Sequence, residues 1–475
     1  MRICLFFFFF LLFLTCPAQS EFYTKTYTAQ QLQEDFQTYK QVLAELHPSL
    51  YWYTSKEEFT QTMNEVEVQL KRPMTKFEFF NLLAPITAKI NCGHTGTTAG
   101  RTTPNRMPLE FKYLKNKLYL YYDYETQETS SKAVRSINGN SVEDIFNKVA
   151  NLQGTDGFIE TPKALFFNNS LTFGYRYHLV YPETDTYKIK LEDGTNITRK
   201  AISEDSLTVL YRKRYPKHPI IHYELKKELN TAILTINTFE KRAFKAAKVR
   251  YKKYIRTFFK KVQKEKIEHL IIDLRQNSGG EDNYASYLYR FLTDKSFQYY
   301  KSMETNPLPF DKKIASKVYL PTEVKNVFLR KLFIKKKGNR FLVRVTPRTK
   351  GLRKQKPKHN SFQEQVYFLI SGKSYSASAE LTAYAQAYRS NTTFIGQETG
   401  GATQGNTSAV FTYLTLPNTK LGNYIPLVKY TMNIPNPKRG RGVEPDHPID
   451  PTIEDILKDR DEEIEFTLQL IRAKN

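Results

Sequence analysis

Two polar segments, each directly after an apolar one, contain the residues best suited to chemistry in this 475-residue chain. The apolar segment 269–274 precedes Gly279 and Gly280, and the apolar segment 366–370 precedes a serine-rich stretch that contains Ser376. An alanine-rich segment follows Ser376 and is expected to be a helix, so the hydroxyl would lie beside the unpaired N–H groups of a helix N-terminus. Ser376 is therefore a candidate nucleophile, which also needs a base to remove its proton.

The backbone around Ser376 offers donors for the negative charge that acyl chemistry develops on oxygen. The N–H of Ala377 is one candidate, and Gly279 or Gly280 is the second, because glycine allows a close approach of the backbone. The alternative is structural, since serine is a preferred helix cap and serine and alanine begin many helices. The local sequence alone leaves both interpretations open.

The C-terminal half, from residue 223, is expected to be an α/β domain. The nearly continuous apolar segments 269–274 and 366–370 are typical of strands that are covered on both faces. Sites in such domains lie just beyond the carboxyl ends of strands, where both polar segments begin. A further strand is expected at 232–236, followed by one long basic helix whose apolar face runs from Phe244 to Val262.

The first hundred residues are expected to form a small helical domain. Apolar residues at three- and four-residue spacing predict helices over 28–46, 56–70 and 76–90. The segment 91–96, which follows the third helix, is expected to be a loop.

The period changes from helical to strand-like after about residue 104. Residues 133–145 predict a strand, an Asn-Gly turn and a helix that Ser141 caps, and residues 187–203 predict a hairpin. The strand-turn-helix resembles that of PDZ domains. An unrelated αβ unit is the alternative.

The first twenty residues are typical of a signal peptide. Arg2 precedes an unbroken apolar run over 3–14, and residues 18–20 offer a small-x-small cleavage site. An uncleaved membrane anchor and a lipoprotein attached through Cys16 are the alternatives. Because Cys4 and Cys16 lie in this segment, the mature chain keeps only Cys92 and forms no internal disulfide.

The charge is strongly positive, with 72 basic against 48 acidic residues and a net charge of +24. Thirteen lysines and arginines and no acid lie between 330 and 358. A solvated basic loop is one interpretation, and contact with an anionic membrane surface is another. Sparse aromatic residues there argue against nucleic acid. The spacing of Cys92 and the histidines predicts no metal site, and no cofactor is implied.

Four strings resemble the C-terminal processing (tail-specific) serine protease family and occur in the order typical of that family. They are LIIDLRQNSGG at 270–280, SYSASAE at 374–380, IGQETGG at 395–401 and GVEPD at 442–446. The resemblance implies a crotonase-like ββα core, peptide hydrolysis through Ser376, and a PDZ-like segment that engages substrate C-termini.

One departure from the family concerns the base. Members with a serine-lysine dyad have a lysine where this chain has Ala402, so the base must come from elsewhere or be absent. Residues 92–95 resemble the Asp-Gly-His-Thr string of the tricorn-core and retinoid-binding-protein branch, which makes His94 the candidate base. The acidic third member stays unassigned, with Glu444 and Glu398 as candidates.

These observations predict a signal peptide (1–20), a helical domain (21–100), a PDZ-like and β-rich region (101–222) and a peptidase domain (223–475) with a basic insertion (301–360). We expect an exported serine endopeptidase of the periplasm or cell envelope that acts on peptides or proteins. The alternatives are an inactive family member that binds peptides or another ligand, and an envelope scaffold or polyanion-binding protein. The substrate and the oligomeric state stay open.

Overall fold

The computed structural model describes residues 20–100, 102, 105–307, 312–321, 324, 326, 331–346 and 349–474. The signal peptide predicted over 1–20 lies outside these residues apart from Ser20. In the described part of the chain, no helix is long and apolar enough to cross a membrane.

Three N-terminal helices form where the sequence predicts them, and a short helix that it did not predict precedes them. They are α1 (Ser20–Thr24), α2 (Ala29–Leu46), α3 (Lys56–Gln69) and α4 (Lys76–Lys89), with the short strands β1 (Thr26–Tyr27) and β2 (Met74–Thr75) between them. A capping box begins each of the three long helices, at Thr28, Ser55 and Thr75. Each cap satisfies N–H groups that the first helical turn leaves unpaired, so the helix starts are encoded locally.

The middle region packs short strands against helices around its own core. Its elements are β4 (Asn105–Arg106), β5 (Leu109–Leu114), β6 (Lys117–Asp123), β7 (Glu128–Thr129), β8 (Val134–Ile137), β9 (Asn140–Ser141), α5 (Val142–Ala150), α6 (Thr161–Leu165), α7 (Ser170–Val180), β10 (Thr186–Leu191), β11 (Asn196–Lys200), β12 (Ile202–Ser203) and α8 (Glu204–Arg214). The predicted strand, Asn-Gly turn and helix are confirmed, because Asn138 and Gly139 have positive φ and Ser141 caps α5. The hairpin predicted at 187–203 is confirmed as β10 and β11.

A six-stranded sheet in the order β13-β14-β15-β22-β23-β26 forms the centre of the C-terminal half. Its strands are β13 (Ile221–Lys226), β14 (Thr231–Ile236), β15 (His269–Asp273), β22 (Gln365–Ile370), β23 (Thr392–Gly396) and β26 (His447–Pro448). All neighbours after the β13-β14 pair are parallel. This sheet confirms the predicted α/β class, whereas the crotonase-like and PDZ-like descriptions stay predictions.

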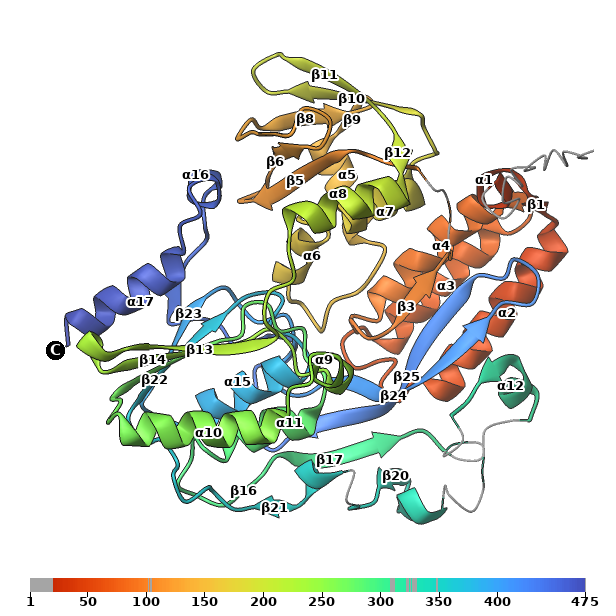
Figure 1. Cartoon of the computed structure of the whole chain (residues 1–475). Helices are drawn as coiled ribbons and strands as arrows, with labels where there is room; N and C mark the ends of the chain where they lie inside the picture. Colours follow the sequence, from red (N-terminus) through yellow and green to blue (C-terminus); the bar gives the residue numbers. More distant parts are fainter. Residues whose placement is uncertain are drawn as a thin grey trace, which may run out of the picture.

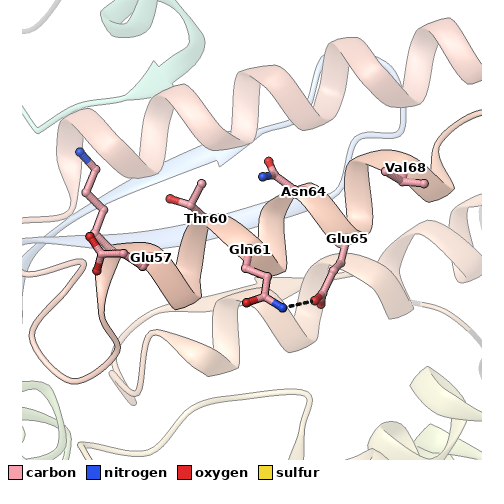
Figure 2. Close-up of a pocket in the computed structure, with 7 residues that line it drawn as sticks. Glu57, Thr60, Gln61, Asn64, Glu65 and Val68 are labelled. Atoms are coloured by element: carbon pink, nitrogen blue, oxygen red, sulfur yellow. Dashed lines mark hydrogen bonds between the residues drawn. The ribbon is translucent and has the colours of Figure 1, made fainter.

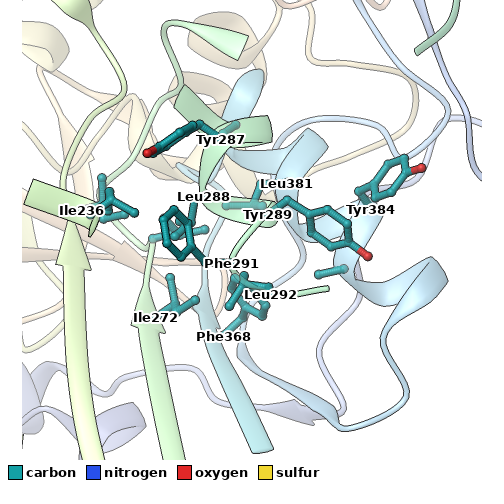
Figure 3. Close-up of a cluster of buried hydrophobic side chains, with 14 of the residues drawn as sticks. Ile236, Ile272, Tyr287, Leu288, Tyr289, Phe291, Leu292, Phe368, Leu381 and Tyr384 are labelled. Atoms are coloured by element: carbon teal, nitrogen blue, oxygen red, sulfur yellow. The ribbon is translucent and has the colours of Figure 1, made fainter. Parts of the chain in front are cut away.

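Helices cover both faces of this sheet. The helices α9 (Lys241–Ala246), α10 (Tyr251–Lys264), α11 (Asp282–Tyr289) and α15 (Ala377–Tyr388) contribute to the larger core, part of which Figure 3 shows. The C-terminal helix α17 (Glu462–Arg472) packs on the other face, where Ile471 contacts the cluster of Ile271 and Leu369; α16 (Ile453–Leu457) precedes it. Burial on both faces explains the continuous apolar sequence of β15 and β22.

The single long helix predicted between Phe244 and Val262 is wrong. Lys248 adopts a left-handed conformation (φ 56°) between α9 and α10. The N–H of Val249 donates to the carbonyl of Phe244 (3.0 Å), which is the hydrogen bond of a Schellman motif and ends α9. Both helices have their apolar residues on the core side. The apolar periodicity therefore continues across the break, and the sequence pattern does not reveal it.

A second sheet joins the two ends of the chain. Its order is β18-β24-β25-β17-β20-β19, with β3 (Gly96–Thr98) also paired to β25. The strands are β17 (Tyr300–Thr305), β18 (Val318–Tyr319), β19 (Ile334–Lys337), β20 (Arg340–Val343), β24 (Thr407–Thr415) and β25 (Gly422–Met432). Helices α2 to α4 lie along β24 and β25 in Figure 1, and one core contains residues of both. The boundary expected at residue 100 therefore does not separate two cores.

Polar contacts reinforce this junction. The buried carboxylate of Asp35 on α2 accepts hydrogen bonds from the N–H groups of Asn418 and Thr419 (2.8 Å each) and from the Thr419 hydroxyl (2.5 Å). The loop between β24 and β25 is thus fixed to a helix almost four hundred residues earlier.

The described part of the basic insertion extends this second sheet. The β19-β20 hairpin lies at the edge of that sheet. The insertion also contains α12 (Lys312–Lys317), η2 (Lys350–Leu352) and β21 (Lys354–Gln355). Two short elements outside the insertion complete the described structure, η1 (Lys227–Leu229) and β16 (Phe297–Gln298). Part of the predicted basic stretch, including Arg330, Pro347 and Arg348, lies outside the described residues.

Candidate active site

The two polar segments follow adjacent parallel strands and are joined by hydrogen bonds. Leu270 of β15 lies beside Val366 of β22, so both segments begin at the same edge of the sheet. The Ser374 hydroxyl donates to the carbonyl of Leu274 (2.9 Å), and the Tyr375 N–H donates to that of Asn277 (3.2 Å). These bonds hold the backbone that carries Ser376 against the backbone that carries Gly279 and Gly280.

Ser376 has a backbone conformation that a helix cap does not need. It occupies the N-cap position of α15 with φ 52° and ψ −125°, and its side chain makes no capping hydrogen bond. The other serine and threonine caps of the described α-helices have extended backbones and do accept such a bond, as Ser141 does. A positive φ costs a non-glycine residue free energy, and such strain gathers at functional sites. The structural alternative for Ser376 is therefore not supported.

Glycines make room around Ser376. A Cβ on Gly279, whose φ is +99°, would lie 2.7 Å from the Cβ of Ser376, and one on Gly401 would lie 3.2 Å from its N. Side chains at these positions would displace the serine.

The predicted oxyanion donors differ in whether their N–H groups already have a hydrogen-bond acceptor. The N–H of Gly279 donates to Asn277 Oδ1 (2.9 Å), whereas the N–H groups of Gly280 and Ala377 have no acceptor among the described residues. A bridge to Phe239 fixes Gly280, and Ala377 begins α15. Ala377 and Gly280 are thus the better candidates for stabilising an oxyanion.

His94 lies in the loop predicted at 91–96, which is anchored on both sides. Thr95 N–H donates to the Cys92 carbonyl (3.0 Å), and the Thr95 hydroxyl hydrogen bonds to Nε2 of the buried His47 (2.9 Å). The following strand, β3, pairs with β25. The loop position is therefore determined by tertiary contacts at residues flanking His94.

A buried carboxylate and a tyrosine hydroxyl hold the His94 ring. The Tyr375 hydroxyl donates to Asp156 Oδ1 (2.7 Å) and lies 3.3 Å from His94 Nδ1. Because the single Tyr375 proton is used on Asp156, the Nδ1–H of His94 must be the donor to Tyr375. This tautomer leaves Nε2 able to accept a proton.

Burial shapes the charges of this cluster. It lowers the pKa of His94, which nearby Asp156 partly offsets, so the ring is neutral near pH 7. Burial raises the pKa of Asp156, while His94, the Tyr375 hydroxyl and the N–H groups of Gly93 and Ala402 favour its ionised form. His94 is thus in the state that a general base requires.

No hydrogen bond joins His94 to Ser376 in the described structure. The two residues are linked through Tyr375, which precedes Ser376 and whose ring lies 4.9 Å from that of His94, centroid to centroid. In proteases without bound substrate such bonds are often long, so the geometry is compatible with proton transfer.

The predicted acidic residues lie elsewhere. Glu398 accepts hydrogen bonds from Gly442 N–H and Arg441, and Glu444 pairs with Lys438. Neither contacts His94 in the described structure. The acidic neighbour of His94 is Asp156, which the sequence analysis missed; its only signal is the turn-like Gly-Thr-Asp-Gly string at 154–157, between α5 and α6.

The His94 loop and the Asp156 loop together contain a group of potential metal ligands. One ligand atom each of Cys92, His94 and Asp156 lie within 4.8 Å of one another. The prediction of no metal site considered spacing along the sequence, and it could not include Asp156, 62 residues after His94.

Two hollows were found on the described surface. A polar groove on α3 (Figure 2), which shares no residue with the site, is lined by Lys56, Glu57, Thr60, Gln61, Asn64, Glu65 and Val68. A mostly apolar cavity of about 440 Å³ lies between the β19-β20 hairpin and strands β24 and β25. Phe411 lines this cavity, and its ring centroid lies 6.3 Å from that of His94. The cavity therefore adjoins the site and can hold an apolar side chain.

The strand-edge position, the strained serine and the neighbouring histidine define a serine-type peptidase, and comparison with known proteins agrees. Residues 230–449 match the model of peptidase family S41. These residues form a serine-peptidase domain of this family, the family of the C-terminal processing proteases, whose substrates are peptides or proteins. No curated protein matches the chain.

Solved structures of mature CPAF share the fold at low sequence identity. Mature CPAF is 15% identical with a TM-score of 0.58, and the match covers 90% of this chain and 94% of that one. Mature CPAF complexed with lactacystin is 16% identical with a TM-score of 0.60, covering 94% and 99%. The photosystem II D1 C-terminal processing protease is 12% identical with a TM-score of 0.41, covering 88% and 93%.

Proposed function

We propose that the protein is an exported endopeptidase in which Ser376 is the nucleophile and His94 is the general base. One observation carries the proposal: Ser376 is held at positive φ at the start of α15 without serving as a cap. A serine on a sharp strand-to-helix turn presents its hydroxyl beside free backbone donors, as nucleophilic serines do.

The chemistry follows from the contacts. His94 Nε2 accepts the hydroxyl proton while Ser376 Oγ bonds to the substrate carbonyl carbon, and the N–H groups of Ala377 and Gly280 stabilise the oxyanion. The proton then passes to the leaving amine, which departs and leaves an acyl-enzyme. Water attacks this ester with His94 as base, and Ser376 regains its proton.

Asp156 and Tyr375 are positioning residues in this proposal. The carboxylate orients the ring through the tyrosine hydroxyl rather than directly, which fixes the Nδ1–H tautomer. The negative charge of Asp156 also favours the imidazolium that forms during proton transfer.

Export to the periplasm or cell envelope and the engagement of substrate C-termini belong to the same proposal. The signal-like string at 1–20 supports export. The β8, β9 and α5 unit, which resembles part of a PDZ domain, supports recognition of a chain terminus.

The basic insertion is proposed to contact anionic lipid headgroups. Lys335, Lys336 and Lys337 are exposed on the β19-β20 hairpin, while Arg340 pairs with Glu304. Flotation with vesicles that contain anionic lipid measures this contact. Undiminished flotation after Lys335, Lys336 and Lys337 are changed to Gln would remove the hairpin from the proposal.

A matched pair of serine variants tests the catalytic assignment. Ser376→Ala removes the nucleophile, whereas Ser378→Ala removes a buried hydroxyl in the same turn that has no hydrogen-bond partner among the described residues. Residues 21–475 are incubated with an unstructured protein that has an apolar C-terminus, and fragments are identified by mass spectrometry.

We expect Ser378→Ala to cleave as the unaltered chain does and Ser376→Ala to lose cleavage by at least about a thousandfold. Equal cleavage by all three proteins would refute Ser376 as nucleophile. Specific binding without cleavage by any of them would instead identify a peptide-binding member of the family.

A further inference from the structure

Three side chains around the His94 loop have the chemistry of a zinc site. A thiol, an imidazole and a carboxylate are ligands that Zn²⁺ accepts together. Ligand atoms of Cys92, His94 and Asp156 lie within 4.8 Å of one another, although Asp156 comes from a different loop. A tetrahedral zinc ion with these ligands separates them by roughly 3.3–3.8 Å, so closure requires movements of about 1 Å.

Each of the three has a ligand atom to give. Asp156 is 2% exposed, and its Oδ1 accepts from Gly93 N–H and Tyr375; the Ala402 N–H also lies near the carboxylate, but the buried Oδ2 has no well-formed hydrogen bond among the described residues. An unsatisfied buried carboxylate oxygen is costly and indicates an absent partner. The Cys92 thiol makes a long contact to the Thr407 carbonyl (3.8 Å), and Thr95 and the His94 backbone are its other polar neighbours. His94 keeps one ring nitrogen without a hydrogen bond in the described structure.

We propose that Cys92, His94 and Asp156 bind one Zn²⁺ reversibly, and that the bound ion inhibits the peptidase by withdrawing His94 from Ser376. The inhibitory half rests on the proposed function, since it requires His94 to be the base. The proposal that the three residues bind Zn²⁺ does not depend on the proposed function.

Inhibition follows whichever ring nitrogen takes the metal. If Nε2 is the ligand, its lone pair is used and no longer accepts the serine proton. If Nδ1 is the ligand, the ring proton must be on Nε2, with the same result. With Nδ1 as the ligand, the hydrogen bond between Nδ1 and the Tyr375 hydroxyl is lost as well.

Charge balance favours the ion in this buried position. The ionised Asp156 and the thiolate of Cys92 together neutralise Zn²⁺, and the thiol proton leaves to solvent as the Zn–S bond forms. His94 is partly exposed whereas Cys92 and Asp156 are buried, so the ion enters from the His94 side. Three protein ligands leave the fourth position to water.

The binding half is tested with Co²⁺ and Zn²⁺ on the Ser376→Ala variant, which keeps the three ligands and cannot digest itself. Cys92 is the single cysteine of residues 21–475, so a thiolate-to-cobalt charge-transfer band reports this residue alone. We expect one equivalent of Co²⁺ to produce the band, Zn²⁺ to displace it, and Cys92→Ser on the same background to abolish it and to weaken zinc binding at least about a hundredfold. Absence of the band at one equivalent overturns the site.

The inhibitory half is tested on chains that retain Ser376. We expect Zn²⁺ to suppress cleavage, EDTA to restore it, and the remaining activity of Cys92→Ser, whatever its level, to be at least tenfold less sensitive to Zn²⁺. Circular dichroism shows that Cys92→Ser is folded, and Cys92→Ala replaces it if it is not. Equal zinc sensitivity with and without Cys92 overturns the inhibitory role. A cobalt band in a protein that cleaves nothing supports the site and refutes only the proposed function.

Discussion

His47 makes the stability of the fold sensitive to acid. The ring is buried, its Nδ1 accepts the N–H of Ser49 (3.3 Å), and its Nε2 is therefore the donor to Thr95 (2.9 Å). Burial without a charged partner lowers the pKa of His47 from 6.5 to about 3. Between pH 6.5 and pH 3, His47 is thus protonated in the unfolded chain but neutral in the folded chain. The free energy of unfolding therefore falls as the pH falls through this window.

The size of the effect follows from the two pKa values. At pH 5 the unfolded ring is protonated in a ratio of about 30 to 1, while the folded ring is neutral, which costs about 2 kcal/mol relative to pH 8. His47→Gln removes this titration. We therefore expect the loss of stability between pH 8 and pH 5 to be about 2 kcal/mol smaller in the variant, even if the variant is less stable at every pH.

Urea denaturation followed by circular dichroism at pH 5, 6, 7 and 8 measures this difference. The pKa of His178, which burial lowers to about 4, adds a similar slope to both proteins and cancels in the comparison. His222→Gln, at an exposed position, is the control and should reproduce the pH dependence of the unaltered chain. Parallel curves for the unaltered chain and His47→Gln would refute the reasoning.

Three further outcomes follow from contacts around Ser376. Tyr375→Phe removes the hydroxyl between Asp156 and His94, and steady-state kinetics should show kcat reduced by about 10- to 100-fold with little change in KM; an unchanged kcat contradicts the positioning role. Gly279→Ala places a Cβ 2.7 Å from Ser376 at φ +99°, so we expect lost cleavage and about 2 kcal/mol lower stability in thermal unfolding, and normal values of both would be incompatible with this packing. Burial raises the pKa of Glu380 to about 7, so stability should fall by about 3 kcal/mol as the pH rises from 4.5 to 7; denaturation of Glu380→Gln should lack this fall, and an identical fall would contradict it.

Local signals made much of the fold predictable. Apolar periodicity predicted the extents and faces of α2, α3 and α4, whose starts the structure shows to be capping boxes, and the Asn-Gly string predicted the turn before α5. These features depend on residues within one or two turns of each other, which the sequence displays directly. The break between α9 and α10 escaped because Lys248 is an unusual residue for a left-handed position.

The candidate site likewise contains residues that local sequence predicts and one that it does not. The strand-turn-helix context identified Ser376 as a candidate from neighbouring residues alone. Asp156 could not be found, because its role depends on a contact with Tyr375, 219 residues away. The turn-like string around Asp156 predicts a loop, and nothing else in the sequence separates this aspartate from the 47 other acidic residues.

The attachment of Asp35 to Asn418 and Thr419 has a consequence for the order in which the chain matures. A ribosome delivers α2 and the His94 loop early, but their partners, β24 and β25, emerge only after more than three hundred further residues. A nascent chain that already exposes Ser376 therefore still lacks the strand that positions His94. Under the proposed mechanism, the chain therefore cannot cleave peptides, its own included, until its synthesis is nearly complete.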